Sequence, residues 1–444
     1  MKYSFSYIRL RLIGITPKVY EYCLILFISV LTSFFIVILP KQDVLGWVTI
    51  VVGLFILLLF IIVTPKLRYI LILAFLFRIS LVLFQTYISP LSLNISDAIM
   101  FEAFGWEYAK NGIDWILSHF TTGAFFYSWI IGLLYSITDR SPFMIEALNA
   151  LFGTLTVWNV YHITRKVWTE EMARKSSMLV ALFPSLILFS SVILREVPII
   201  YSYTLGLLFF LRWEETKRLK WILSSIIMIL LSVGFHTGML GFMIVLGFIM
   251  LKDWLKTFIK KRYYIPLKTS ASLIFIILIF VIFILRFGWG LEKVGGSLEN
   301  ISAEFLSYQQ QIAARDRARY LSELVIKTPI DFLWQTPIRV FYFLFSPFIW
   351  MIKTPSDLLG FIDAILYIYL SYKLFISFSS VLSSRRGKIL LIFFISEIII
   401  FSLTTSNYGT ALRHRAKFFP LLVVLAYNRM EENNKEEENN VKNP

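Results

Sequence analysis

Charged residues are scarce in this sequence: they make up 16% of the 444 residues, against about 25% in soluble proteins. Apolar residues make up 58%, and the mean hydropathy is +0.73. This balance excludes a soluble enzyme, a nucleic-acid-binding domain and a disordered chain. Apolar runs of spanning length fill most of the sequence, whereas the alternating ten-residue segments of a β-barrel are lacking. The sequence therefore predicts an all-α polytopic membrane protein.

Cysteine is almost absent as well. The single cysteine, Cys23, lies in an apolar run, so a disulfide framework, a zinc site and thiol chemistry are excluded. The sequence also lacks a P-loop, a dinucleotide-binding fingerprint, HExxH and GxSxG in a fitting context. Nucleotide hydrolysis and zinc chemistry are therefore not expected, and an activated substrate would have to arrive from the membrane.

Basic residues exceed acidic ones, and the net charge is +15. Most Lys and Arg lie in short loops between apolar runs, as the positive-inside rule requires, so this charge predicts topology and not a nucleic-acid partner. We expect about twelve spans with both termini in the cytoplasm of a cell-membrane protein. The predicted spans are 20–39, 44–63, 69–88, 144–163, 177–194, 198–212, 221–236, 238–251, 269–287, 358–377, 388–404 and 417–428.

Two further apolar segments, 124–137 and 337–353, are predicted not to cross. The first has 14 residues, about 21 Å of helix against a hydrocarbon core of about 30 Å, and the second carries Pro347 near its middle. If either crossed fully, clusters such as Arg165–Lys166 or Arg385–Arg386 would lie outside. Treated as short or re-entrant helices, both segments leave these clusters inside.

The predicted organisation has five parts. They are two extra N-terminal spans (1–66), a membrane core (67–287) with an external loop (89–123), an external amphipathic segment (288–336), C-terminal spans (337–428) and a disordered cytoplasmic tail (429–444). The external loop 405–416 breaks the charge rule because it carries Arg413, His414 and Arg415. An anionic ligand at the outer membrane surface would explain these cations.

Acidic residues of the external segments are the candidate catalytic groups. Asp97 and Glu102 are five residues apart on a predicted helix, so about 140° separates their directions. Either could act as a general base or hold a divalent cation such as Mg²⁺ or Mn²⁺. Alternatively, both are acids that favour a helix start and face water.

Glu196 lies at the junction of two spans, where an acid is costly and often functional. The alternative is a local Arg195–Glu196 pair at the interface.

Candidate substrate-binding residues are Arg195, His236 at a tight external junction, and the three cationic residues of the 405–416 loop. Arg413, His414 and Arg415 could hold a phosphate or diphosphate, or could form an interfacial belt against lipid headgroups. In an extended loop Arg413 and Arg415 would point the same way. In a helix they would diverge by about 200°, and only one could reach a site.

The run from Asp97 through Glu196 resembles the GT-C superfamily of polytopic glycosyltransferases, especially the bacterial branch related to protein mannosyltransferases. The resemblance rests on an acidic external segment, SDAIMFEAFGWEYAKNG, followed by a short aromatic helix, GAFFYSWIIGLLYSITDRSP. A helix of the type FMIEALNALFGTLTVWNVYHITRKVW and an Ala-rich span with an internal Pro, MLVALFPSLILFSS, lead to a second external acid in LREVP. FLFSPFIW and RHRAKFFP also resemble membrane polysaccharide polymerases. The chain departs from the family in its separated acids, its two extra spans and its lack of a large C-terminal soluble domain.

The resemblance implies a sugar donor linked to polyprenyl phosphate or polyprenyl diphosphate, and an inverting displacement at the external membrane face. The acceptor would be a glycan, lipid or protein in cell-envelope assembly. Asp97 would be the base or its helper, Glu102 and Glu196 would orient the acceptor or a cation, and the cationic loop would hold the leaving phosphate. One alternative is a repeat-unit polymerase of the O-antigen or capsule type, with His236 or Glu196 as base. A lipid-linked sugar flippase or transporter is an alternative of another class.

Overall fold

The computed structural model describes residues 41–90, 95–259, 274, 278, 317–324 and 326–428. The predicted span 20–39, most of 269–287, most of the 288–336 segment and the 429–444 tail lie outside these residues. Within them the chain is helical, and the nearest approach to sheet pairing is one isolated bridge between Arg319 and Asn407. The all-α prediction is therefore confirmed.

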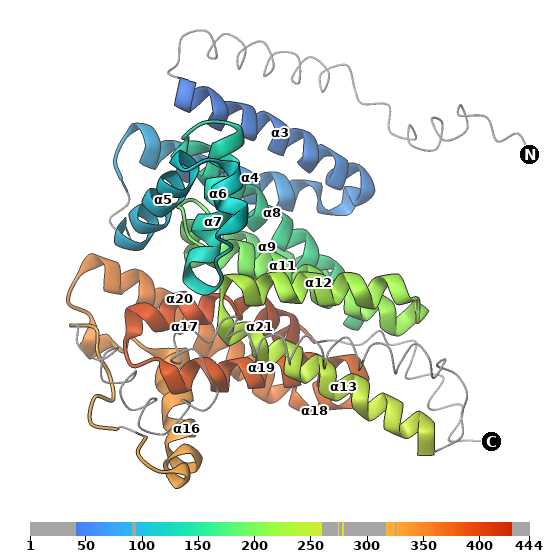
Figure 1. Ribbon diagram of the computed structural model, residues 1–444. Coiled ribbons are helices and arrows are strands. Elements are labelled where there is room, and N and C mark those ends of the chain that lie inside the picture. Colours follow the sequence, from blue (N-terminus) through green and yellow to red (C-terminus); the bar gives the residue numbers. More distant parts are fainter. Residues whose placement is uncertain are drawn as a thin grey trace, which may run out of the picture.

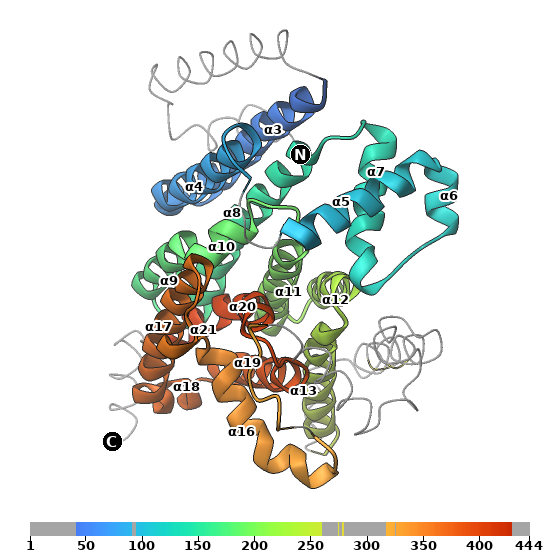
Figure 2. The ribbon, with the colours of Figure 1, turned by 90° about the vertical axis from the view of Figure 1, so that its left-hand side faces the viewer.

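The first half of the described chain builds a bundle around one long helix, α8, against which α3, α4, α9 and α11 pack (Figure 1). Two shorter elements, α5 and α7, pack on each other beside this bundle, and α6 joins them (Figure 2). The helices up to this point are α3 (Lys41–Val63), α4 (Arg68–Tyr87), α5 (Ile95–Lys110), α6 (Ile113–Ser118), α7 (Phe126–Ile137), α8 (Pro142–Val167), α9 (Glu170–Leu182), α10 (Pro184–Phe189) and α11 (Glu196–Thr216).

The second half adds helices that close over α9 to α11. Phe183 of the α9–α10 junction stacks on Phe419 at a ring distance of 3.4 Å, which joins the two halves. The remaining helices are α12 (Leu219–Phe235), α13 (Leu240–Ile259), α16 (Pro329–Phe345), α17 (Pro355–Ile376), α18 (Phe378–Ser383), α19 (Arg385–Thr404), α20 (Tyr408–Ala416) and α21 (Phe419–Ala426).

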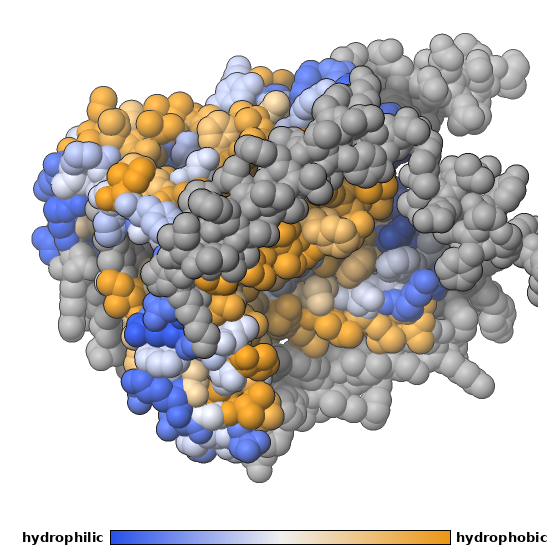
Figure 3. Space-filling model, turned by 90° about the horizontal axis from the view of Figure 1, so that it is seen from above, coloured by the Kyte–Doolittle hydropathy of each residue, from blue (hydrophilic) through white to orange (hydrophobic). Residues whose placement is uncertain are grey.

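Five described helices are long and apolar enough to cross a membrane: Gln42–Val63, Pro65–Tyr87, Pro142–Val167, Pro355–Ile376 and Arg385–Thr404. Their exposed surfaces include large apolar side chains such as Phe55, Leu76 and Ile365, which suit contact with lipid tails. Figure 3 shows broad hydrophobic areas on one face of the molecule. Length, composition and surface therefore agree with a polytopic membrane protein.

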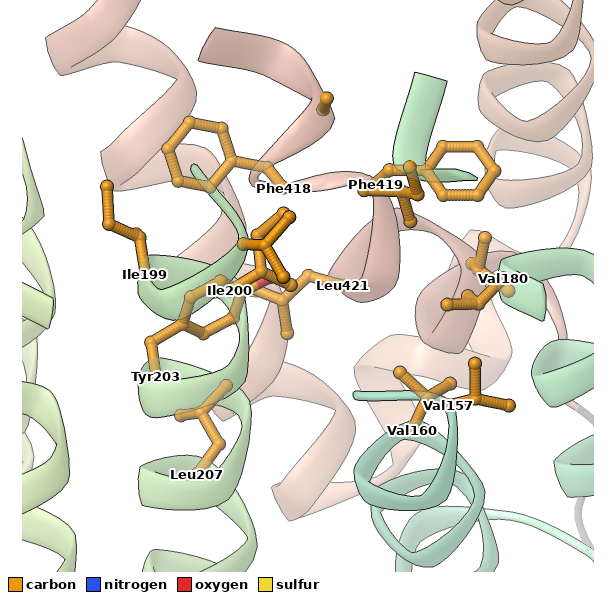
Figure 4. Close-up of a cluster of buried hydrophobic side chains, with 14 of the residues drawn as sticks. Val157, Val160, Val180, Ile199, Ile200, Tyr203, Leu207, Phe418, Phe419 and Leu421 are labelled. Carbon is orange, nitrogen blue, oxygen red and sulfur yellow. The ribbon is translucent and has the colours of Figure 1, made fainter. Parts of the chain in front are cut away.

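Two of the predicted spans differ in the structure. The run 177–194 is divided into α9 and α10 at Phe183, whose extended backbone precedes Pro184; a proline cannot continue the hydrogen-bonding of a preceding helix. The run 417–428 forms only the eight-residue α21, every residue of which is buried. Figure 4 shows Phe418, Phe419 and Leu421 packed in the core with residues of α8, α9 and α11. The apolar character of this segment thus reflects burial in protein.

Ion pairs gather the loops at one end of the bundle, which we call the basic end. Lys66, after α3, pairs with Glu170, after α8, at 2.7 Å. Because α4 leaves this end and α8 returns to it, the intervening α5, α6 and α7 make no net crossing. The prediction that 124–137 does not cross fits this arrangement and stays a prediction.

The same argument applies to the later helices. Arg385, at the start of α19, pairs with Glu214 at 3.1 Å and with Asp253 at 2.5 Å, so the ends of α11 and α13 also lie at the basic end. At the start of α17, by contrast, Asp357 accepts from Tyr408 of α20 at 3.2 Å, at the opposite end. The segment 337–353 lies in α16 and the turn after it, and α17 alone runs from there to the basic end. Which end faces the cytoplasm stays a prediction.

Candidate functional site

The end of the bundle opposite the basic end holds a charged cluster, which we call the Arg413 cluster: Asp97, Glu196, Arg413, His414 and Lys417. Three elements bring it together. Asp97 lies in the first turn of α5, Glu196 is the first residue of α11, and Arg413 and His414 lie in the last turn of α20. Residues 316 positions apart in sequence therefore meet at one point.

Arg413 bridges the two carboxylates. Its guanidinium donates through Nη1 to Asp97 Oδ2 and through Nη2 to Glu196 Oε1, the latter at 3.1 Å. Glu196 is fully buried, whereas the Asp97 side chain is 36% exposed. Burial alone would lower the pKa of Arg413, but Glu196 and Asp97 outweigh burial and raise it above its ordinary value. The cluster therefore presents a fixed cation with one accessible carboxylate beside it.

Lys417 completes the cluster, and it is a residue that sequence reasoning missed. Its ammonium is fully buried, 3.7 Å from Glu196 Oε1 and 2.7 Å from His414 Nδ1. His414 in turn lies 5.2 Å from the ring of His236, and both imidazoles pack on Phe401. The signal was present in the sequence, because Lys417 follows Arg413 by four residues and so lies one helical turn further on the same face.

A local cap and two main-chain bonds to a distant segment hold the 405–416 segment as a helix. Asn407 caps α20 by accepting from the backbone amides of Gly409 and Thr410, which satisfies two free donors of the first turn. Main-chain bonds from Tyr320 to Ser406 and from Tyr408 to Ala318, each 2.9 Å, hold the start of the helix. This fixes the divergence of the two arginines.

Arg415 points away from the Arg413 cluster. It is fully buried and donates to the carbonyls of Leu344 at 2.8 Å, Ser346, and Gly360 at 3.1 Å. These carbonyls belong to the end of α16 and to α17, so the guanidinium holds the turn between the two helices. The structure thus separates two residues that the sequence allowed to act together: Arg413 lies in the cluster and Arg415 supports the main chain.

Glu102 also lies apart from the Arg413 cluster. Its carboxylate accepts from both Arg140 Nε (2.9 Å) and Nη2 (2.8 Å), and from the Tyr135 hydroxyl at 3.2 Å. Asp97 and Glu102 therefore do not converge on a shared cation site. Among the described residues, no group of three or more His, Cys, Asp or Glu could hold a metal ion.

A short loop before α11 holds Glu196 in place. Asn149 of α8 donates to the carbonyls of Val192 at 2.7 Å and Leu194 at 3.0 Å, and accepts from Tyr127. Arg195 donates to the carbonyl of Phe235 at 2.8 Å, at the end of α12. Arg195 therefore joins α11 to α12 behind Glu196, and Asn149 fixes the loop from the side of α8.

The described helices and this cluster define a polytopic helical membrane protein with a charged site at one end. Residues 122–289 match the family described as dolichyl-phosphate-mannose-protein mannosyltransferase. No curated protein and no solved structure matches the chain. The family match confirms the resemblance to the GT-C superfamily and supports a membrane glycosyltransferase of this type that uses a lipid-linked sugar. The matched region includes Glu196 and His236, whereas Asp97 and Arg413 lie outside it.

Proposed function

We propose that this protein transfers a sugar from a polyprenyl-phosphate or polyprenyl-diphosphate donor to a hydroxyl group, at the external membrane face, in the assembly of a cell-envelope glycan. The observation that carries this proposal is the position of Arg413 between Asp97 and Glu196. The family match supports the class of reaction and the lipid-linked donor.

Arg413 is the proposed contact for the donor phosphate. A planar guanidinium binds phosphate oxygens through two parallel hydrogen bonds. Without substrate, those donors are directed at Asp97 and Glu196. A phosphate that arrives at the exposed side of the cluster competes for Arg413 with Asp97, the more accessible of the two carboxylates, and binding then releases Asp97.

Asp97 is the proposed general base. The acceptor oxygen attacks the anomeric carbon of the donor, the bond from that carbon to the phosphate oxygen breaks, and the acceptor proton passes to the Asp97 carboxylate. The lipid phosphate leaves with the electron pair of the broken bond, and the anomeric configuration inverts. Arg413 stabilises the charge that grows on the leaving phosphate.

Glu196 and Lys417 position Arg413 in this scheme. A largely enclosed arginine needs a counter-charge, and the fully buried Glu196 supplies one from the start of α11. Lys417 lies 3.7 Å from the same Glu196 oxygen, Oε1, and adds positive charge behind the phosphate, while His414 contacts the Lys417 ammonium. Arg195 and His236 support the same cluster through α12 and through the ring of His414.

Replacement of Asp97 by Asn tests the proposal. The substitution keeps the side-chain volume but removes the base, so the initial rate should fall about 10²-fold or more, while the unfolding temperature stays near that of the wild type. The measurement is transfer of radiolabel from a polyprenyl-phosphate-sugar extract to product by the purified protein. Asp114→Asn is the matched control, because Asp114 lies exposed in the neighbouring α6. Equal rates for wild type and Asp97→Asn would rule out Asp97 as the base.

A further inference from the structure

A pocket of about 350 Å³, which the chemistry above does not use, is lined by chain neighbours of Asp97 and Glu196. The end of α4, one face of α5, the start of α8 and the loop before α11 surround it. Its lining includes Ala98 and Ile99, which directly follow Asp97, and Val192 and Ile193, which shortly precede Glu196. The pocket and the proposed base therefore share the first turns of α5.

The polar lining of the pocket combines donors and acceptors. Gln85, Glu102, Arg140 and Glu146 contribute to its walls. Glu102 is buried and held by its two bonds to Arg140, while Glu146 accepts from Thr86 at 3.4 Å. These groups are thus held in place by neighbours, and carboxylates and amides of this kind can bind the hydroxyl groups of a neutral ligand.

The remaining lining is apolar and selects among ligand classes. Pro90, Ile99, Pro142 and Ile193 provide surface that suits the carbon face of a pyranose ring. The lining carries two carboxylates and one arginine, and that arginine is already paired with Glu102. The excess of negative charge disfavours a phosphate. Four polar side chains disfavour a lipid tail. A volume of this size lies at the lower end of the usual range for small-molecule sites, about 300–1,000 Å³.

We infer that this pocket binds one sugar ring of the saccharide substrate and places it against Asp97 and Arg413. The inference rests on the proposed function and extends it, because it names where the ring lies and which residues contact it. Gln85, Glu102 and Glu146 bind ring hydroxyls, and Ile99 packs on the face of the ring. Donor and acceptor both contain such a ring, so the experiments are arranged to distinguish them.

The first experiment measures binding without turnover. In a Cys23→Ser background, Ile99→Cys places a single thiol at the pocket, and Ile113→Cys on α6 is the matched control, since both side chains are exposed (60% and 42%) and Ile113 does not line the pocket. Methyl glycosides of common hexoses, at up to about 100 mM, should include at least one that slows maleimide modification of Ile99→Cys severalfold. The rate for Ile113→Cys should not change. If no glycoside slows the modification of Ile99→Cys, or if the modification of both cysteines is slowed equally, the inference is overturned.

The same thiol distinguishes the source of the ring. Polyprenyl-phosphate-linked hexose is compared with polyprenyl phosphate that carries no sugar. Protection of Ile99→Cys by the sugar-linked lipid alone assigns the pocket to the donor ring. Protection by a methyl glycoside but by neither lipid assigns it to the acceptor. Equal protection by the bare lipid phosphate contradicts a sugar pocket.

The second experiment uses transfer kinetics. Ile99→Trp fills the pocket without altering a charged group, and it should raise the KM for the substrate whose ring binds there about tenfold, while the KM for the other substrate stays unchanged. Ile113→Trp should alter neither KM. If the wild type transfers sugar and Ile99→Trp keeps both KM values, the pocket assignment fails and the proposed function stands. If the wild type transfers none while Ile99→Cys is still protected by a glycoside, the proposed function fails instead.

Discussion

At the scale of single residues, the two arginines of α20 have different environments in spite of their similar sequence context. Arg413 contacts two carboxylates at the site, and Arg415 contacts main-chain carbonyls of α16 and α17. Arg413 is half-buried and Arg415 is fully buried, and both belong to one short helix. Their substitution by lysine should therefore affect different properties.

Arg413→Lys should weaken use of the donor. Lysine keeps the charge but loses the planar pair of donors, and loss of one charge-assisted hydrogen bond, about 1.5 kcal/mol, corresponds to about a tenfold rise in donor KM.

Arg415→Lys should instead lower the free energy of unfolding by roughly 2–5 kcal/mol, because buried carbonyls lose their donors, with little change in donor KM. Donor KM in detergent at constant anionic lipid and the unfolding midpoint are the measurements. If neither substitution changes the donor KM, Arg413 does not bind the donor, and the alternative of contact with lipid headgroups applies.

The sequence predicted part of this arrangement and left part open. The excess of cations on a predicted external loop pointed to an anionic ligand, and the divergence of Arg413 and Arg415 followed once a helix was assumed. Two features hold the segment as a helix. The Asn407 cap is local, whereas the main-chain bonds to Tyr320 and Ala318 are long-range contacts that the sequence does not reveal. The partner of Glu102 was also beyond sequence reasoning, since Arg140 lies 38 residues away.

At the scale of elements, α8 positions the site through one polar side chain. Asn149 fixes the loop that leads to Glu196, while Asn159, ten residues further along the same helix, donates to Thr204 of α11 at 3.0 Å. Both asparagines are buried, as expected for polar residues that join helices. Of the two, only Asn149 contacts the loop that leads to Glu196.

Asn149→Leu should therefore lower both stability and transfer. Two buried carbonyls would each lose one donor, at a cost of about 1–3 kcal/mol, and Glu196 would lose its fixed position against Arg413. Asn159→Leu is the matched control and should lower the unfolding midpoint with a much smaller effect on kcat. The comparison uses kcat per folded protein and the thermal midpoint of each variant. Equal loss of kcat in both variants would mean that Asn149 acts through stability alone.

At two segments, hydropathy alone predicts a span that the structure does not contain. The segment 417–428 is apolar enough to be mistaken for a span, yet α21 is short, lies beside α8, α9 and α11 (Figure 4), and also packs on α17. The run 177–194 contained its own warning in Pro184, which divides it into two helices. Hydropathy measures the preference for leaving water, and it does not distinguish lipid from protein interior.

At the scale of the whole molecule, the loops sort into two groups in space. Residues predicted to be cytoplasmic meet as ion pairs at the basic end, among them Lys166 with Glu215 and Arg386 with Glu215, the latter at 3.2 Å. Residues predicted to be external meet in the Arg413 cluster. Loop charge predicts this grouping, because the positive-inside rule assigns each cluster to a side from the sequence alone. The contacts confirm the grouping, and the orientation in the membrane is left for experiment.

Cysteine labelling in intact cells tests that orientation. In a Cys23→Ser background, Ser118→Cys reports the end of α6, near the site end, and Ser383→Cys reports the last residue of α18, near the basic end; both serines are exposed. Ser383 is preferred to Ser384, whose side chain caps α19. An impermeant maleimide should label Ser118→Cys in intact cells, and it should label Ser383→Cys only after permeabilisation.

The reverse pattern would place Asp97 and Arg413 in the cytoplasm, and the proposed reaction at the external face would be wrong even if the protein transfers sugar. Labelling of both from outside would contradict the two-ended arrangement itself, because α17 has to carry the chain from one end to the other between these two positions.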